Sequence, residues 1–229
     1  MTYLAAAPDL TNISIANADY TYPAGELQSD ILRIDVESNE SYRTLYTDSE
    51  FFELNFRSKS SYRELFDYVY NSLKTYVPLL YDSQTGQIAV TSDPNNPSDY
   101  TVLTFEARDD INDLFSAIAE GIVMAPNTEL GLIFNPRSNN LTVRGSSEMV
   151  EYSGLIMANM EFDINNTSID SLSMHVQSDG VYMGSRLIMP NFNLHGGARE
   201  NRISLTAGFR GDGTAHSAAK TGFKGGSKT

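Results

Sequence analysis

The chain has no cysteine and no tryptophan among its 229 residues. Without cysteine it has no disulfide framework, no zinc site with thiolate ligands and no cysteine nucleophile. No apolar run approaches the ~18 residues that would cross a bilayer. The N-terminal segment MTYLAAAPDL lacks the basic region and the full apolar region of a signal peptide, so we do not expect secretion through a cleaved signal.

Positive charge is scarce and unevenly distributed. The chain has 16 Lys and Arg against 29 Asp and Glu, a net charge of −13. Residues 1–113 carry −12 and residues 114–197 carry −5, whereas residues 198–229 carry +4. This balance excludes ordinary nucleic-acid binding, which needs cations to replace the counterions of the phosphates. The charge either keeps the protein soluble or forms an acidic face that repels a polyanion; alternatively, the basic tail docks on an acidic neighbour.

Hydrophobic periodicity predicts a β-rich chain. Apolar and polar residues alternate over 31–37, as in a strand that buries one face. From 129 to 209 the pattern predicts only strands, and consecutive hairpins form an antiparallel meander. The predicted fold class is therefore mainly β (α+β), an antiparallel β-sandwich or barrel-like meander. The turns that we predict in this region lie at 135–140, at Asn165-Asn166, at Asp179-Gly180 and at His195-Gly196-Gly197.

Two helices are predicted as insertions in the N-terminal half. Ser61 and Glu64 form a capping box at the start of a helix over about 61–77, in which apolar residues follow a helical stripe. A second helix, over about 109–121, begins after two aspartates. Residues 1–210 are thus expected to form a single β-rich domain. Residues 211–229 are expected to form a flexible basic tail rich in Gly, Ser and Lys, and no internal repeat is apparent.

Residues that could carry chemistry are few. His175, His195 and His216 have no metal-ligand spacing, and the aspartates near 109–113 are explained by the positive end of a helix. The sequence has no nucleophile motif and no phosphate-binding loop. The chain has 13 tyrosines, several of them at helical spacing, so we interpret these mainly as core and partly as a possible carbohydrate or interface surface. We therefore predict no enzyme activity, no catalytic residue, no metal and no cofactor.

The C-terminal region offers one resemblance. An apolar strand ending in Pro190-Asn191, a glycine-rich break and an alternating strand over 203–209 follow one another. This arrangement, over about 170–212, resembles the end of the major tail (tail tube) protein of tailed bacteriophages. The resemblance implies a β-sandwich subunit that forms hexameric rings, which stack into a tube through which genomic DNA passes without specific binding. It also implies other tail proteins as partners, assembly in the host cytoplasm, a place in the virion and no membrane. Two helices are more than a minimal tube subunit needs, so the type of subunit stays open.

We therefore expect a virion structural protein that self-assembles. Assembly is predicted through sheet edges in the meander 129–209, because an edge strand leaves backbone groups unpaired until a partner closes it. An acidic lumen would let DNA slide, since it offers no cations to the phosphates. The alternatives are another viral structural subunit (capsid or tail tip) and a carbohydrate-binding β-domain. The candidate lumen residues are Glu148, Glu151, Glu161 and Asp163.

Overall fold

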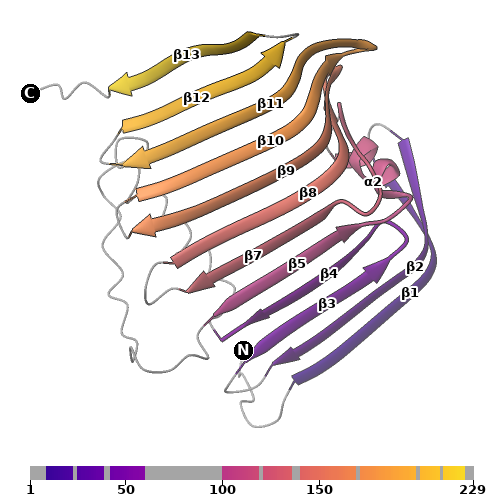
Figure 1. Cartoon of the computed structure of the whole chain (residues 1–229). Helices are drawn as coiled ribbons and strands as arrows, with labels where there is room; N and C mark the ends of the chain where they lie inside the picture. The colour runs from indigo at the N-terminus through magenta and orange to yellow at the C-terminus, as the bar shows by residue number, and fades with distance from the viewer. Residues whose placement is uncertain are drawn as a thin grey trace, which may run out of the picture.

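Within the residues that it describes, the computed structural model is one antiparallel sheet with one helix (Figure 1). The described residues are 9–22, 25–38, 42–59, 100–118, 121–135, 140–168, 171–199, 202–211 and 214–224. The elements are β1 (Asp9–Tyr22), β2 (Gly25–Ser38), β3 (Arg43–Ser49), β4 (Phe52–Ser58), β5 (Thr101–Ala107), α2 (Ile111–Ile118), β6 (Ile122–Met124), β7 (Glu129–Asn135), β8 (Asn140–Tyr152), β9 (Leu155–Ser168), β10 (Ser171–Met183), β11 (Arg186–Arg199), β12 (Arg202–Gly211) and β13 (Thr214–Lys224).

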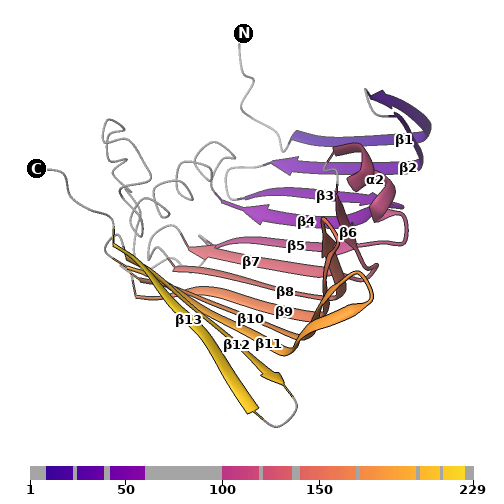
Figure 2. The same ribbon diagram turned by 90° about the horizontal axis from the view of Figure 1, so that it is seen from above.

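The strands pair almost entirely in chain order. The sheet runs from β1 to β13, and only β6 lies off this path, where it pairs with the far end of β8. The mainly β, antiparallel meander is therefore confirmed. The sandwich or barrel is not: the sheet is open, because β1 and β13 lie at its opposite edges and do not meet (Figure 2).

Several predicted turns lie in the wrong place. Asp179-Gly180 does not end a strand but lies inside β10, which continues to Met183 before it turns into β11. A further hairpin, between β8 and β9, turns at Ser153-Gly154, where both residues have positive φ (51° and 82°). Positive φ at both central positions is what a two-residue hairpin turn requires. The Asp-Gly dipeptide favours a turn locally, but the register of both neighbouring strands extends past it.

The C-terminal half contains two further differences of the same kind. Asn165-Asn166 lies inside β9, where Asn165 pairs with Thr142 of β8. His195-Gly196-Gly197 lies inside β11 and pairs with β10. Residues 214–224, expected as part of a flexible tail, form β13, which pairs with β12 from Gly211 back to Arg202. Backbone pairing along an existing edge does not require a strand to carry a large apolar surface of its own.

One helix is found in the described residues. α2 begins two residues after Asp109 and confirms the second predicted helix, in a shorter form. The Asn112 side chain ties it to β6, since its amide donates to the Met124 carbonyl (2.9 Å) and accepts from the Met124 N–H (2.8 Å). The predicted helix over 61–77 lies outside the described residues. No helix in the described part of the chain is long and apolar enough to cross a membrane.

The hydrophobic core that the described residues form is small. Phe51, Ala107 and Ile111 are buried together between α2 and the sheet. The partly buried residues Leu27, Phe105 and Met124 pack against this cluster. Among the described residues, α2 is the one helix or strand that lies outside the sheet. Most of the sheet therefore has no second layer among the described residues.

The two faces of the sheet differ in chemistry. One face, which we call the apolar face, carries a continuous row of large apolar side chains across eight neighbouring strands, from β2 to β10. All of them except Phe56 are only half-buried. The opposite face we call the polar face. The row on the apolar face consists of Val36, Leu45, Phe56, Leu103, Leu132, Val143, Ile164 and Met174.

Candidate functional site

The polar face carries an acidic ladder. Asp48, Glu53, Glu106 and Glu129 are direct cross-strand neighbours on β3, β4, β5 and β7. Directly opposed like charges destabilise a sheet. The fold nevertheless places four carboxylates in one row. Because this row does not stabilise the sheet, we treat it as a candidate functional feature.

The excess of acid extends over the whole polar face. From β2 to β10, before the strands bend, the face has eight acids and three arginines, a net charge of −5. The same strands carry one charged residue, Arg43, on the apolar face. The sheet therefore divides charge from apolar surface. The acids are Asp35, Glu37, Asp48, Glu53, Glu106, Glu129, Glu161 and Asp163, and the bases are Arg33, Arg57 and Arg144.

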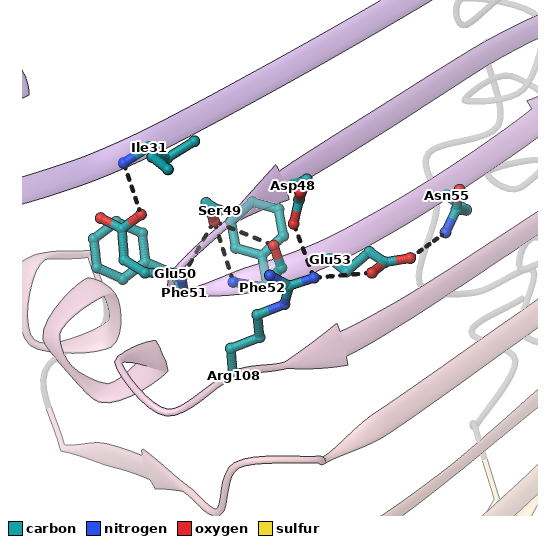
Figure 3. A network of polar contacts seen from close by, with 9 residues as sticks. All are labelled: Ile31, Asp48, Ser49, Glu50, Phe51, Phe52, Glu53, Asn55 and Arg108. Carbon is teal, nitrogen blue, oxygen red and sulfur yellow. Dashed lines mark hydrogen bonds and ion pairs between the residues drawn. The ribbon is translucent and has the colours of Figure 1, made fainter. Parts of the chain in front are cut away.

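Arg108 neutralises one end of the ladder (Figure 3). Its Nη2 lies 2.8 Å from Asp48 Oδ1 and 3.0 Å from Glu53 Oε2. Asn55 donates its side-chain amide to the other oxygen of Glu53, at 3.0 Å. For Glu106 and Glu129 the described residues provide no ion pair. The middle of the ladder thus keeps its negative charge.

Two of the four predicted lumen residues lie on this face. Ser146 of β8 pairs with Glu129, the last residue of the acidic ladder, and Glu161 of β9 pairs with Ser146. Asp163 lies two residues further along β9. Arg144 Nε is 2.6 Å from Asp163 Oδ2. The hydrogen bond from Arg144, with a second one from Asn165, outweighs burial and lowers the pKa of Asp163 below its usual value. This carboxylate therefore stays ionised at neutral pH.

The other two predicted residues lie elsewhere. Glu148 is exposed at the position where β8 bends, and Glu151 lies beyond the bend, opposite Val123 of β6 and Ile156 of β9. The ladder residues Asp48, Glu53, Glu106 and Glu129 were not among the sequence candidates. Each stands in an alternating strand, but no local signal indicates that strands up to 80 residues apart bring them into one row.

A shallow hollow lies beside the ladder over β7 to β10. Its lining includes Arg144, Glu161, Asp163 and His175. The His175 ring stacks on that of its cross-strand partner His195, with centroids 4.3 Å apart and planes 7° from parallel. No group of three His, Asp or Glu side chains among the described residues could hold a metal ion. The hollow offers acceptors and imidazoles but no assembled nucleophile and base.

A second feature crosses the sheet, where the long strands curve (Figure 1). Four asparagines with positive φ (47° to 59°) lie in a row with four acidic residues, of which all but Glu50 are exposed. The backbone pairing between neighbouring strands skips Asn17–Asp30 and Glu148–Asn159, since only the residues on either side of these two positions are paired. We call this row the bend line. Its members are Asn17, Asp30, Glu50, Asn127, Glu148, Asn159, Asp179 and Asn191.

Serine hydroxyls fix the backbone at the bend line. Ser49, Ser147 and Ser178 are buried, and each precedes an acidic residue of the line. In all three, Oγ accepts the backbone N–H two residues later, at 3.3 Å. The same local device therefore shapes three separate strands. It satisfies a backbone donor that the skipped ladder position leaves without a partner.

The bend line also exposes an internal repeat, contrary to the expectation of none. Asn127, Asn159 and Asn191 are spaced 32 residues apart. The segments LIMAN, ending at Asn159, and LIMPN, ending at Asn191, occupy the same place in the hairpins β8–β9 and β10–β11. Hydrophobic alternation hides this repeat, because every strand alternates. The near-identical pentapeptides are the signal that would have found it.

The resemblance to tail tube proteins finds no independent support or contradiction. Family models, curated proteins and solved structures contain no match to this chain.

Proposed function

We propose that this protein is a non-enzymatic structural subunit that works by assembling with copies of itself. The observation that carries the proposal is the open sheet: within the described residues, neither β1 nor β13 has a partner on its outer side. Unpaired strand edges are a ready template for another chain, and soluble proteins normally block or cover them. The tail tube of a bacteriophage is the assembly to which the C-terminal resemblance points.

The edges revise the expected mode of assembly. We expected contact through edges in the meander 129–209, but β7 to β12 each have a strand on both sides. The available edges belong to β1 and β13. Joined edges would extend the sheet from subunit to subunit, as a ring requires.

The two faces support a tube in which the polar face is turned inward. The acidic ladder and the face around it carry −5 over β2 to β10, so DNA in contact with them would find few cations to bind. The half-buried row on the apolar face gains from burial, worth about 25 cal/mol per Å² of apolar surface, when a further layer covers it. In this arrangement the apolar face forms the outer side of the ring.

The test is the state of the purified full-length chain. Light scattering after size exclusion, from micromolar to near-millimolar concentration, measures the mass, and negative-stain microscopy shows the shape. We expect rings or short tubes. A chain that stays monomeric over this concentration range would contradict the proposal. An icosahedral lattice would instead favour a capsid subunit.

The non-enzymatic part has its own test. The carbohydrate alternative draws on the hollow, in which Glu129 and Glu161 lie two strand spacings apart, about 10 Å. A panel of glycans, esters and phosphoesters should show no turnover. Turnover that is lost in Glu161→Gln and kept in Glu148→Gln would contradict this part and place a reaction at the hollow.

A further inference from the structure

We infer that assembly is directional: the β13 edge of one copy pairs with the β1 edge of the next. This inference rests on the proposed function and specifies its interface. Two other pairings are available to an open sheet, β1 with β1 and β13 with β13, each about a two-fold axis. The strand number and the edge lengths are compatible with the mixed pairing, and the charges of the two edges select it.

The first observation is the number of strands. Without β6, the path across the sheet contains twelve strands, each antiparallel to its neighbour. Because twelve is even, β1 and β13 run in opposite directions. A second copy in the same orientation therefore presents a β1 that is antiparallel to the β13 of the first copy. The alternation continues across the subunit boundary without a break.

The second observation is the charge of the two edges. β1 has two acids and no base, and β2 beside it has four acids and one base, which together give −5. β13 has two lysines and no acid, and β12 beside it has two arginines and no acid, which together give +4. Opposite charges favour the mixed pairing, and like charges oppose both two-fold pairings.

The third observation is the length of the edges. β1 has 14 residues and β13 has 11, so nearly all of the shorter strand can find backbone partners. A mixed contact uses a different surface on each side. It therefore repeats from copy to copy, and it forms a ring where the rotation closes and a filament where it does not. Two-fold contacts at one edge would stop at a dimer.

Charge reversal at each edge tests the direction. Lys220→Glu with Lys224→Glu makes both edge strands acidic, and Asp9→Lys with Asp19→Lys makes both edge strands basic. Each double variant alone should lose assembly, with at least a tenfold rise in the concentration at which half of the chains assemble. An equimolar mixture of the two should recover it, because each basic edge then meets an acidic one in alternation. Recovery also shows that both variants are folded.

Net charge separates this effect from general repulsion. Asp9→Lys with Asp19→Lys changes the net charge from −13 to −9, so general repulsion predicts stronger assembly, whereas edge pairing predicts its loss. The control Arg186→Glu with Lys228→Glu brings the chain to −17, as Lys220→Glu with Lys224→Glu does, but changes neither edge strand. It should assemble nearly as the unmodified chain does.

The outcomes distinguish the two proposals. If the unmodified chain assembles but both double variants also assemble, or the mixture gives no recovery, the directional edge contact is wrong and self-assembly stands. If the unmodified chain stays monomeric, both proposals fail. Deletion of 213–229, which removes β13, gives an independent reading. Assembly yield and its salt response should both change; if neither does, this segment is only a solubilising appendage.

Discussion

The side-chain amide of Asn159 donates to Oδ2 of Asp179 over 2.8 Å and links the bend of β9 to the bend of β10. Asp179 lies opposite Asn191 of β11, at a position that the backbone pairing of β10 and β11 skips. A bend in one strand therefore coincides with bends in its neighbours. The sheet curves along a row built from short polar side chains, which is why three of its strands share the Ser-acid sequence.

Substitutions of Asn159 should separate backbone conformation from side-chain contact. The residue has φ of 47°, a region that glycine enters freely and that β-branched residues avoid. Asn159→Gly should be nearly neutral, Asn159→Ala should lower the free energy of unfolding by about 1 kcal/mol, and Asn159→Val should lower it further. Urea unfolding measures the series. If Asn159→Gly and Asn159→Ala lowered the free energy of unfolding equally, the hydrogen bond to Asp179 and not the backbone conformation would be the stabilising feature.

Two glycines of neighbouring strands form a matched pair. A Cβ at Gly145 would lie 2.4 Å from the Phe162 ring and 2.8 Å from the Glu129 carbonyl oxygen, whereas a Cβ at Gly131 meets nothing within 4 Å. Gly145→Ala should reduce the free energy of unfolding by about 1–3 kcal/mol through overpacking. Gly131→Ala should be neutral or slightly stabilising. A neutral Gly145→Ala in chemical unfolding would show that β7, β8 and β9 are packed more loosely here.

The middle of the acidic ladder should be stabilised by a change of charge. Glu106 lies between Glu53 and Glu129. Glu106→Lys turns two like-charge neighbours into opposite pairs, each worth roughly 0.2–1 kcal/mol, and Glu106→Gln removes only the repulsion. At low salt we expect the unmodified chain to have the lowest thermal stability, Glu106→Gln a higher one and Glu106→Lys the highest. The differences should shrink at 1 M salt, where the Debye length is about 3 Å. A salt-independent order would exclude a charge effect.

Glu50 should make stability depend on acid. Its Oε1 accepts the Asp30 N–H at 2.9 Å. Its Oε2 accepts the Ile31 N–H at 3.3 Å (Figure 3). Burial alone would raise the pKa of Glu50, but these hydrogen bonds, together with its own backbone N–H, hold the pKa below its usual value. A pKa lowered by folding stabilises the protein above the unfolded pKa, and the gain is lost as the pH falls through the folded pKa.

Glu50→Gln measures this contribution. At pH 7 the free energy of unfolding of the unmodified chain should exceed that of Glu50→Gln by no more than about 1 kcal/mol, because the carboxylate is near solvent. The difference should shrink as the pH falls through the folded pKa of Glu50, which lies below the usual value for glutamate. Glu148→Gln, at the corresponding place on β8, should show a smaller difference at pH 7. A gap between unmodified chain and Glu50→Gln that widens in acid would reverse the assigned direction.

Local signals in the sequence found most strands and the start of α2. Alternation over 31–37 identifies part of β2, and the aspartates at 109 and 110 mark the helix that begins at Ile111. The same local signals placed one turn correctly, between β7 and β8, and misplaced the other three. Asp179-Gly180 favours a tight turn by its own conformational preference, but cross-strand hydrogen bonds on both sides of β10 keep it within the strand. Pairing with two neighbours outweighs the preference of one dipeptide.

The sequence by itself determined the β-rich class, the acidic body, the basic C-terminal region and the polar and apolar sides of each strand, because these depend on composition and on a period of two residues. Only the tertiary structure decided that the sheet stays open, that Asp48, Glu53, Glu106 and Glu129 form one row, and that β1 and β13 are its edges. Register and strand order depend on hydrogen bonds between segments far apart in the chain. A pattern within one segment carries no information about which segment lies beside it.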